Sequence, residues 1–141
     1  MHTHKLRLRI QRVEANNQCL LALRERIALL AVVKGEHVPE HLDFSGMKEW
    51  PEDLWILDSP IAKTAKMADH FQFLADILEK NEESFHYLKS LGALIQLLGS
   101  ITTDEFTTLL PIPSSIMVIC GRIGIHLGVT IVNLKGVPQT V

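Results

Sequence analysis

The sequence predicts a mainly α fold: a single-domain helical bundle over residues 1–141, with a long N-terminal helix, a helical hairpin and a buried C-terminal element. Three observations support this class. A Leu- and Ala-rich stretch lies near the N-terminus, two apolar stripes with helical spacing follow, and the last apolar stretch carries helix start and stop signals. A chain of 141 residues is also long enough for one domain with one core.

The first helix is expected over about residues 5–33. Residues 18–33 are rich in Leu and Ala, and Lys34-Gly35 supplies a cation and a glycine at the C-terminal end. Residues 5–13 fit the helix through a heptad-like spacing of apolar positions. The same residues alternate between apolar and basic, which is the pattern of a half-buried strand. This second interpretation stays open.

Residues 36–58 form an acidic loop within the domain, because prolines, Gly46 and clustered acids interrupt any sustained period. Trp50 and Trp55 flank a short turn in this loop. Either the two indoles pin the loop to the core, or they form a surface for a partner.

A helical hairpin is expected next. Ser59 and Pro60 begin a helix that ends at Asn81, and a second apolar stripe continues to Gly99. Thr102 and Glu105 form a capping box for a further short helix, which Pro111 ends. The predicted core therefore consists mainly of helix faces.

The last apolar stretch, residues 114–136, is predicted as the buried C-terminal helix between Pro113 and Gly136. On that helix Gly121, Gly124 and Gly128 lie at i, i+3 and i+7 and give a smooth face for close approach of another helix. Many β-branched residues favour strands instead, so the alternative is an α+β fold with residues 5–13 and 116–133 as strands. Arg122 and His126 argue against a membrane span here.

The composition indicates a protein that associates with itself or with a protein partner. Apolar residues make up 47% of the chain, which is high for a small monomer that must cover its own surface. We therefore expect a non-enzymatic protein–protein interaction module, an adaptor, inhibitor or assembly subunit, that acts through apolar helix faces. The residues expected at the partner or self-association surface are Gly121, Gly124, Gly128, Arg122, Trp50 and Trp55.

The charge distribution supports a second function. The net charge is only −2, but basic residues gather at the N-terminus and acids gather in the loop at 36–58. Four cations of the N-terminal arm can neutralise phosphates, as expected of a small nucleic-acid-binding regulator. Alternatively, they pair with the acidic loop. These cations are Lys5, Arg7, Arg9 and Arg12.

The sequence contains no recognised catalytic constellation, and we expect no metal or cofactor. The pentapeptide from His37 to His41 matches a zinc-peptidase pattern, but Pro39 disrupts the helix that such a site needs. Cys19 and Cys120 lie far apart, which indicates buried thiols in a reducing compartment. With no visible signal peptide, a cytoplasmic location is expected.

Overall fold

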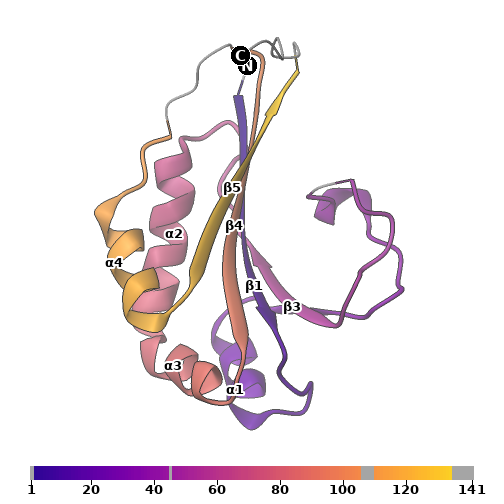
Figure 1. Cartoon of the computed structure of the whole chain (residues 1–141), viewed down its shortest axis with the longest axis vertical. Helices are drawn as coiled ribbons and strands as arrows, with labels where there is room; N and C mark the ends of the chain where they lie inside the picture. Colours follow the sequence, from indigo (N-terminus) through magenta and orange to yellow (C-terminus); the bar gives the residue numbers. More distant parts are fainter. Residues whose placement is uncertain (1, 45, 106–109, 135–141) are drawn as a thin grey trace.

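The computed structural model describes residues 2–44, 46–105 and 110–134, which form an α+β fold (Figure 1). Five strands make one mixed sheet in the order β2-β3-β1-β4-β5. The prediction of a mainly helical bundle is wrong. The alternative α+β class is correct, although only residues 126–133 of the strand region expected at 116–133 are extended, and residues 116–123 are helical. The strands are β1 (His2–Gln11), β2 (Leu30–Val32), β3 (Leu54–Asp58), β4 (Leu94–Thr103) and β5 (His126–Asn133); the helices are α1 (Gln18–Arg26), α2 (Met67–Lys80), α3 (Glu82–Ser90) and α4 (Ser114–Ile123).

The helices cover one face of the sheet (Figure 1). Leu6, Leu8 and Ile10 alternate along β1 and are buried in the main core, together with helical residues such as Phe71 and Leu74. The sheet is antiparallel except where β4 and β5 pair in parallel. That parallel pair requires a crossover connection, which α4 provides.

Residues 33–53, which we call the arm, cross to the opposite face of the sheet between β2 and β3 (Figure 1). The arm contains a short 3-10 helix, Glu40–Leu42. Its Val38 and Trp50 pack with Leu54 and Ile56 of β3 in a small second core. The sheet is therefore buried on both faces where the arm covers it.

The predicted N-terminal helix is replaced by β1, α1 and β2. Leu6, Leu8 and Ile10 all reach the core only if the chain is extended, because a strand brings every second residue to one face. Asn17 caps α1: its side-chain oxygen accepts the amide N–H of Leu20 at 3.1 Å. The strand interpretation of residues 5–13 is thus confirmed as far as Gln11, where β1 ends.

The predicted C-terminal helix is also wrong, because the chain forms α4 and then β5. Gly124 ends α4 in the left-handed region with φ 86°, and its amide donates to the carbonyl of Cys120. The start signal at Pro113 is correct, since this residue is the N-cap of α4. The helix stops at an internal glycine rather than at Lys135-Gly136, which lie outside the described residues.

The predicted hairpin is correct only in part. The helical stripe of Phe71, Leu74 and Leu78 is buried, but α2 begins at Met67 rather than Ser59. The second stripe ends early, because α3 stops at Ser90 and the chain continues as β4. Thr102 and Thr103 end β4 instead of capping a helix; part of that predicted helix, residues 106–109, lies outside the described residues.

Candidate interaction surface

The most unusual surface of the molecule is the outer edge of β5. This strand is last in the sheet and, among the described strands, pairs with β4 alone. It is 8 residues long and carries no Asp, Glu, Lys or Arg. Natural edge strands are usually short, charged, bulged or covered, because their backbone N–H and C=O groups invite pairing with another chain. By this standard β5 is poorly protected.

Exposed apolar side chains gather at the C-terminal half of the same strand. Leu127 and Val129 pack against the main core, but the next positions along the strand do not. Ile131 is 53% exposed and Val132, on the opposite face, is 45% exposed. Met117 and Val118 of α4, the helix that leads into β5, are exposed as well. The edge therefore has apolar side chains beside its backbone groups.

The three glycines predicted as one helix face do not share an element. Gly121 lies within α4, Gly124 ends that helix, and Gly128 lies in β5. A Cβ at Gly121 would meet nothing within 4 Å, so the described structure places no close helix contact there. Arg122 is half-exposed on α4 and forms an ion pair of 2.7 Å with Glu82.

The two tryptophans lie on opposite faces of the sheet. Trp50 is 3% exposed and belongs to the second core, whereas Trp55 is 6% exposed and belongs to the main core. Within the described structure neither indole forms an exposed patch. Trp50 holds the arm against the second core, as one of the two interpretations proposed, whereas Trp55 lies in β3 and not in a loop.

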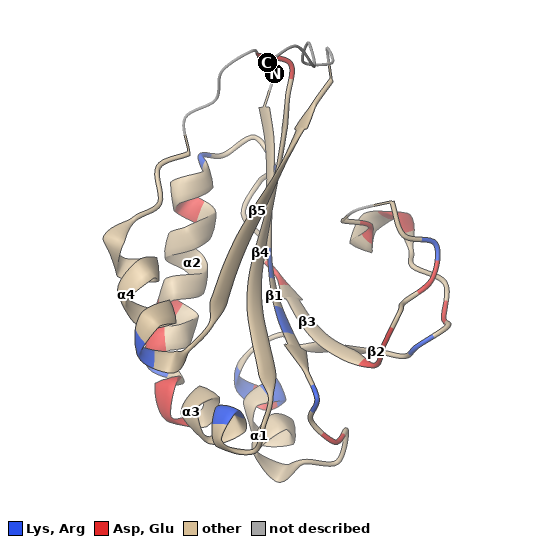
Figure 2. Cartoon of the chain, viewed as in Figure 1, with Lys and Arg blue, Asp and Glu red and all other residues tan. Residues whose placement is uncertain are grey.

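Three cations of the predicted basic row lie on β1, whose basic positions are blue in Figure 2. Arg7, only 4% exposed, contacts Asp58 at 2.6 Å and also donates to the carbonyl of Leu42. The Arg7 guanidinium lies 4.9 Å from the Phe44 ring centroid. Lys5 donates to the Asp43 carbonyl at 3.0 Å, and Arg9 bonds to Gln96.

Three of the four cations thus have partners within the chain, and Arg12 is the exposed member of the row. This geometry follows the alternative in which the basic segment pairs with the acidic loop, since Asp58 is the last acid of that loop. A buried guanidinium that already bonds a carboxylate and a carbonyl has few donors left for phosphate.

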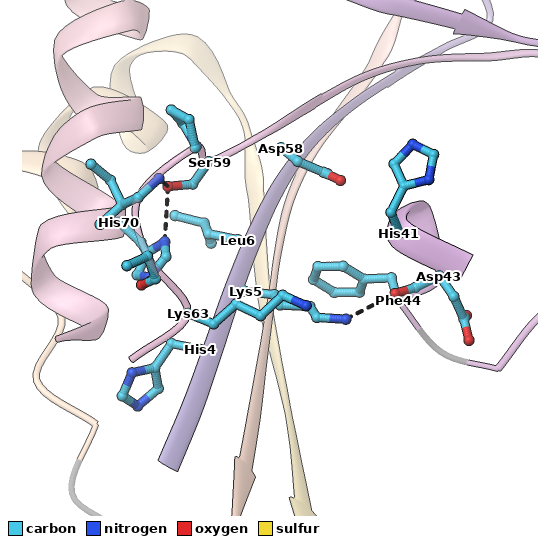
Figure 3. A pocket seen from close by; sticks show the side chains of 13 residues that line it. His4, Lys5, Leu6, His41, Asp43, Phe44, Asp58, Ser59, Lys63 and His70 are labelled. Atoms are coloured by element: carbon cyan, nitrogen blue, oxygen red, sulfur yellow. Dashed lines mark hydrogen bonds between the residues drawn. The ribbon is translucent and has the colours of Figure 1, made fainter. Parts of the chain in front are cut away.

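A cavity of about 290 Å³ lies between β1, the arm and the connection from β3 to α2 (Figure 3). Within it, the Ser59 hydroxyl lies 2.8 Å from His70 Nδ1, and His70 Nε2 lies 3.1 Å from the Ala62 carbonyl. The carbonyl fixes the proton on Nε2, so the hydroxyl donates to Nδ1. Burial lowers the pKa of His70.

This serine and histidine pair has the arrangement of a nucleophile and its base. The nearby Ile61 amide donates to the Ser59 oxygen itself at 3.3 Å. His4 contributes to the same region by bonding the Ala65 carbonyl at 2.7 Å. The contacts of Ser59 and His70 hold the connection between β3 and α2 in place. Because the pair is 11 residues apart, no local motif signalled it.

The pentapeptide from His37 to His41 lies in the arm, and Cys120 lies in α4. His37 and Glu49 form an isolated bridge, His41 lies in the 3-10 helix of the arm, and no cluster of metal-ligating side chains is found in the described ranges. Burial raises the pKa of Cys120 to about 11, which keeps its thiol protonated and poorly nucleophilic. None of the described helices combines the length and the apolar character needed to cross a bilayer.

Comparisons with known proteins found no family model, curated protein or solved structure that matches this chain.

Proposed function

We propose that the protein is a non-enzymatic protein–protein interaction module that pairs β5 with β5 of a second copy. The observation that carries this proposal is the long, uncharged edge strand at the end of the sheet. A strand added there satisfies backbone N–H and C=O groups, while the side chains on both faces cover exposed apolar surface.

A second copy fits this edge because β5 has no Asp, Glu, Lys or Arg that would repel the same residue in the β5 strand of the partner. Two-fold antiparallel pairing is isologous, so each copy presents the same residues to the other. Ile131 and Val132, exposed on opposite faces of one strand, then gain apolar neighbours on both faces of the joined sheet. The high apolar content of the chain is consistent with surface that becomes covered on association.

Size-exclusion chromatography with light scattering tests the proposal. The mass should rise from 15.9 kDa toward that of two chains as concentration increases. Ile131→Lys places a charge on the edge and should abolish the increase. Leu30→Lys is the matched control, because Leu30 is 43% exposed on β2, at the other edge of the sheet.

A wild-type protein that stays monomeric over about 5 to 500 μM would contradict the pairing of two copies. Equal loss of association in Ile131→Lys and Leu30→Lys would also contradict it, since the effect would then come from charge and not from β5. Circular dichroism of each variant verifies the fold. The absorbance ratio of the eluted peak, at 260 and 280 nm, reports in the same run whether nucleic acid accompanies the protein.

A further inference from the structure

The second core leaves a small pocket between the arm and the open face of the sheet. It has a volume of about 130 Å³. Apolar side chains form most of its wall, and two arginines of β1 face it. The lining residues that matter are Arg7, Arg9, Trp50, Phe44, Leu98 and Thr130. Trp50 and the two arginines, which the sequence suggested for separate functions, meet here.

The two arginines differ in how their charge is matched. Arg7 has two hydrogen bonds to the Asp58 carboxylate, at 2.6 and 3.0 Å. Arg9 instead donates both from Nε, at 3.0 Å, and from one terminal nitrogen to the amide oxygen of Gln96. In the described part of the chain, no carboxylate lies within ion-pair distance of Arg9.

Partial burial of the Arg9 guanidinium without a hydrogen-bonded carboxylate is energetically unfavourable. Burial lowers the pKa of Arg9, an effect that the charge of Glu52 opposes and that of Arg7 reinforces. The side chain of Glu52 is bonded to Gln11 at 3.1 Å. A half-buried cation is normally matched by a hydrogen-bonded anion, because desolvation otherwise goes uncompensated. Arg9 therefore lacks the partner that Arg7 has.

We propose that this pocket binds a carboxylate group through the guanidinium of Arg9. Gln96 occupies one edge of the guanidinium and fixes its plane, which leaves its remaining N–H groups for a second acceptor. A carboxylate matches both the single unmatched charge and the planar fork of arginine. The Thr130 hydroxyl, which lines the same pocket, is a further donor.

The size and the walls of the pocket restrict the ligand. Sites for drug-sized molecules usually have volumes of roughly 300 to 1,000 Å³. At about 130 Å³ the pocket takes a carboxylate with a short apolar chain. A free short-chain acid has this chemistry, and so has an Asp or Glu side chain of another protein.

Titration of the full chain with sodium propionate, followed by the indole N–H signals in nuclear magnetic resonance spectra, tests this site. Trp50 lines the pocket and Trp55 lies on the other face of the sheet, so one indole reports and the other is an internal reference. We expect a saturable shift of the Trp50 signal. Propionamide, the neutral analogue, should cause little shift.

Arg9→Gln should weaken propionate binding at least ~10-fold, as expected when a charge-assisted hydrogen bond is lost. Arg9→Lys, which keeps the charge but not the fork, should weaken it less. Arg12→Gln is the matched control, because it removes the same charge from an exposed position next to β1 and should leave the affinity within about twofold.

A blocked peptide, acetyl-Gly-Glu-Gly-amide, distinguishes the two sources. Tighter binding of the peptide than of propionate assigns the pocket to an acidic side chain of a protein; tighter binding of propionate assigns it to a free acid. Absence of a saturable Trp50 shift with either compound, or an equal shift with propionamide, would overturn the proposal. The same titrations on Ile131→Lys keep this outcome separate from β5 pairing.

Discussion

The two edge strands of the sheet, β2 and β5, differ in how their unpaired backbone groups are protected. At one end β2 is only 3 residues long, and the chain leaves it directly to form the arm. The amide of Lys34 in the arm donates to the Asp53 carboxylate at 2.9 Å. At the other end β5 is 8 residues long and uncharged, and among the described elements the sheet ends with it.

The open face of the sheet shows the same contrast. Next to β3, the arm brings a carbonyl and aromatic rings to Arg7, and β3 supplies the Asp58 carboxylate. Two residues further along β1, Arg9 donates to the side-chain amide oxygen of Gln96 on β4, and no carboxylate in the described part of the chain lies within ion-pair distance of it. A cation can be buried on this face where a second layer completes its bonds. Beside Arg9 the same layer leaves a small pocket, which suits a ligand.

Asp58→Ala, in the part of the sheet that the arm covers, should have the largest effect on the free energy of unfolding. Removal of the carboxylate leaves Arg7 buried without a counter-charge, which should lower the free energy of unfolding by about 2 to 3 kcal/mol. This is near the lower limit for buried pairs, because the Asp58 side chain is 33% exposed. Urea denaturation measures the change.

Glu82→Ala is the control for Asp58→Ala. It removes an ion pair in which the Arg122 side chain is 52% exposed, so the urea midpoint should move far less. Equal effects of the two substitutions would contradict the distinction between a covered and an open part of the molecule.

A smaller effect is expected from alanine at two glycines near the β5 end. Gly121→Ala should raise the free energy of unfolding by about 0.5 to 1 kcal/mol, because glycine is a poor residue inside a helix and a Cβ there meets nothing within 4 Å. Gly128→Ala should be neutral or slightly stabilising, since its nearest neighbour would be Leu98 at 3.7 Å.

Association should persist in both glycine variants. Light scattering checks this, and a monomeric Gly121→Ala protein would show that a glycine face on α4, and not the β5 edge, joins the two copies.

The smallest effect is a gradual decrease in the free energy of unfolding at low pH, caused by His70. Burial, the largest cause, lowers the pKa of His70 below its ordinary value of 6.5, and the nearby His4 adds to this; the Ala62 carbonyl and Asp69 oppose it. Below pH 6.5 the unfolded chain therefore binds more protons than the folded chain. Stability should be constant above this pH and should fall as the pH decreases toward the lower folded pKa.

Urea midpoints between about pH 8 and 5 measure this effect. His70→Gln retains hydrogen-bonding groups but cannot titrate, so its midpoint should lose the His70 part of the slope. A slope identical in wild type and variant would assign the pH dependence to other groups.

The sequence predicted several local features correctly. The alternation in residues 5–13, the Pro113 start of α4 and the buried stripe of Phe71, Leu74 and Leu78 are properties of neighbouring residues, and the structure confirms them. The proposed pairing of the basic segment with the acidic loop also agrees with the Arg7 and Asp58 contact. By contrast, the contact between Ser59 and His70 had no local signal.

By itself, the sequence determined where short apolar patterns begin and which residues can end a helix. It did not determine whether residues 114–133 form a helix or a strand, because their apolar residues fit both patterns almost equally. Tertiary structure decided this: β4 offers β5 a complete row of backbone partners, and Gly124 lets the chain turn toward them. An edge strand likewise exists only once the order of strands is fixed, since the neighbours that pair or fail to pair lie far apart in the chain.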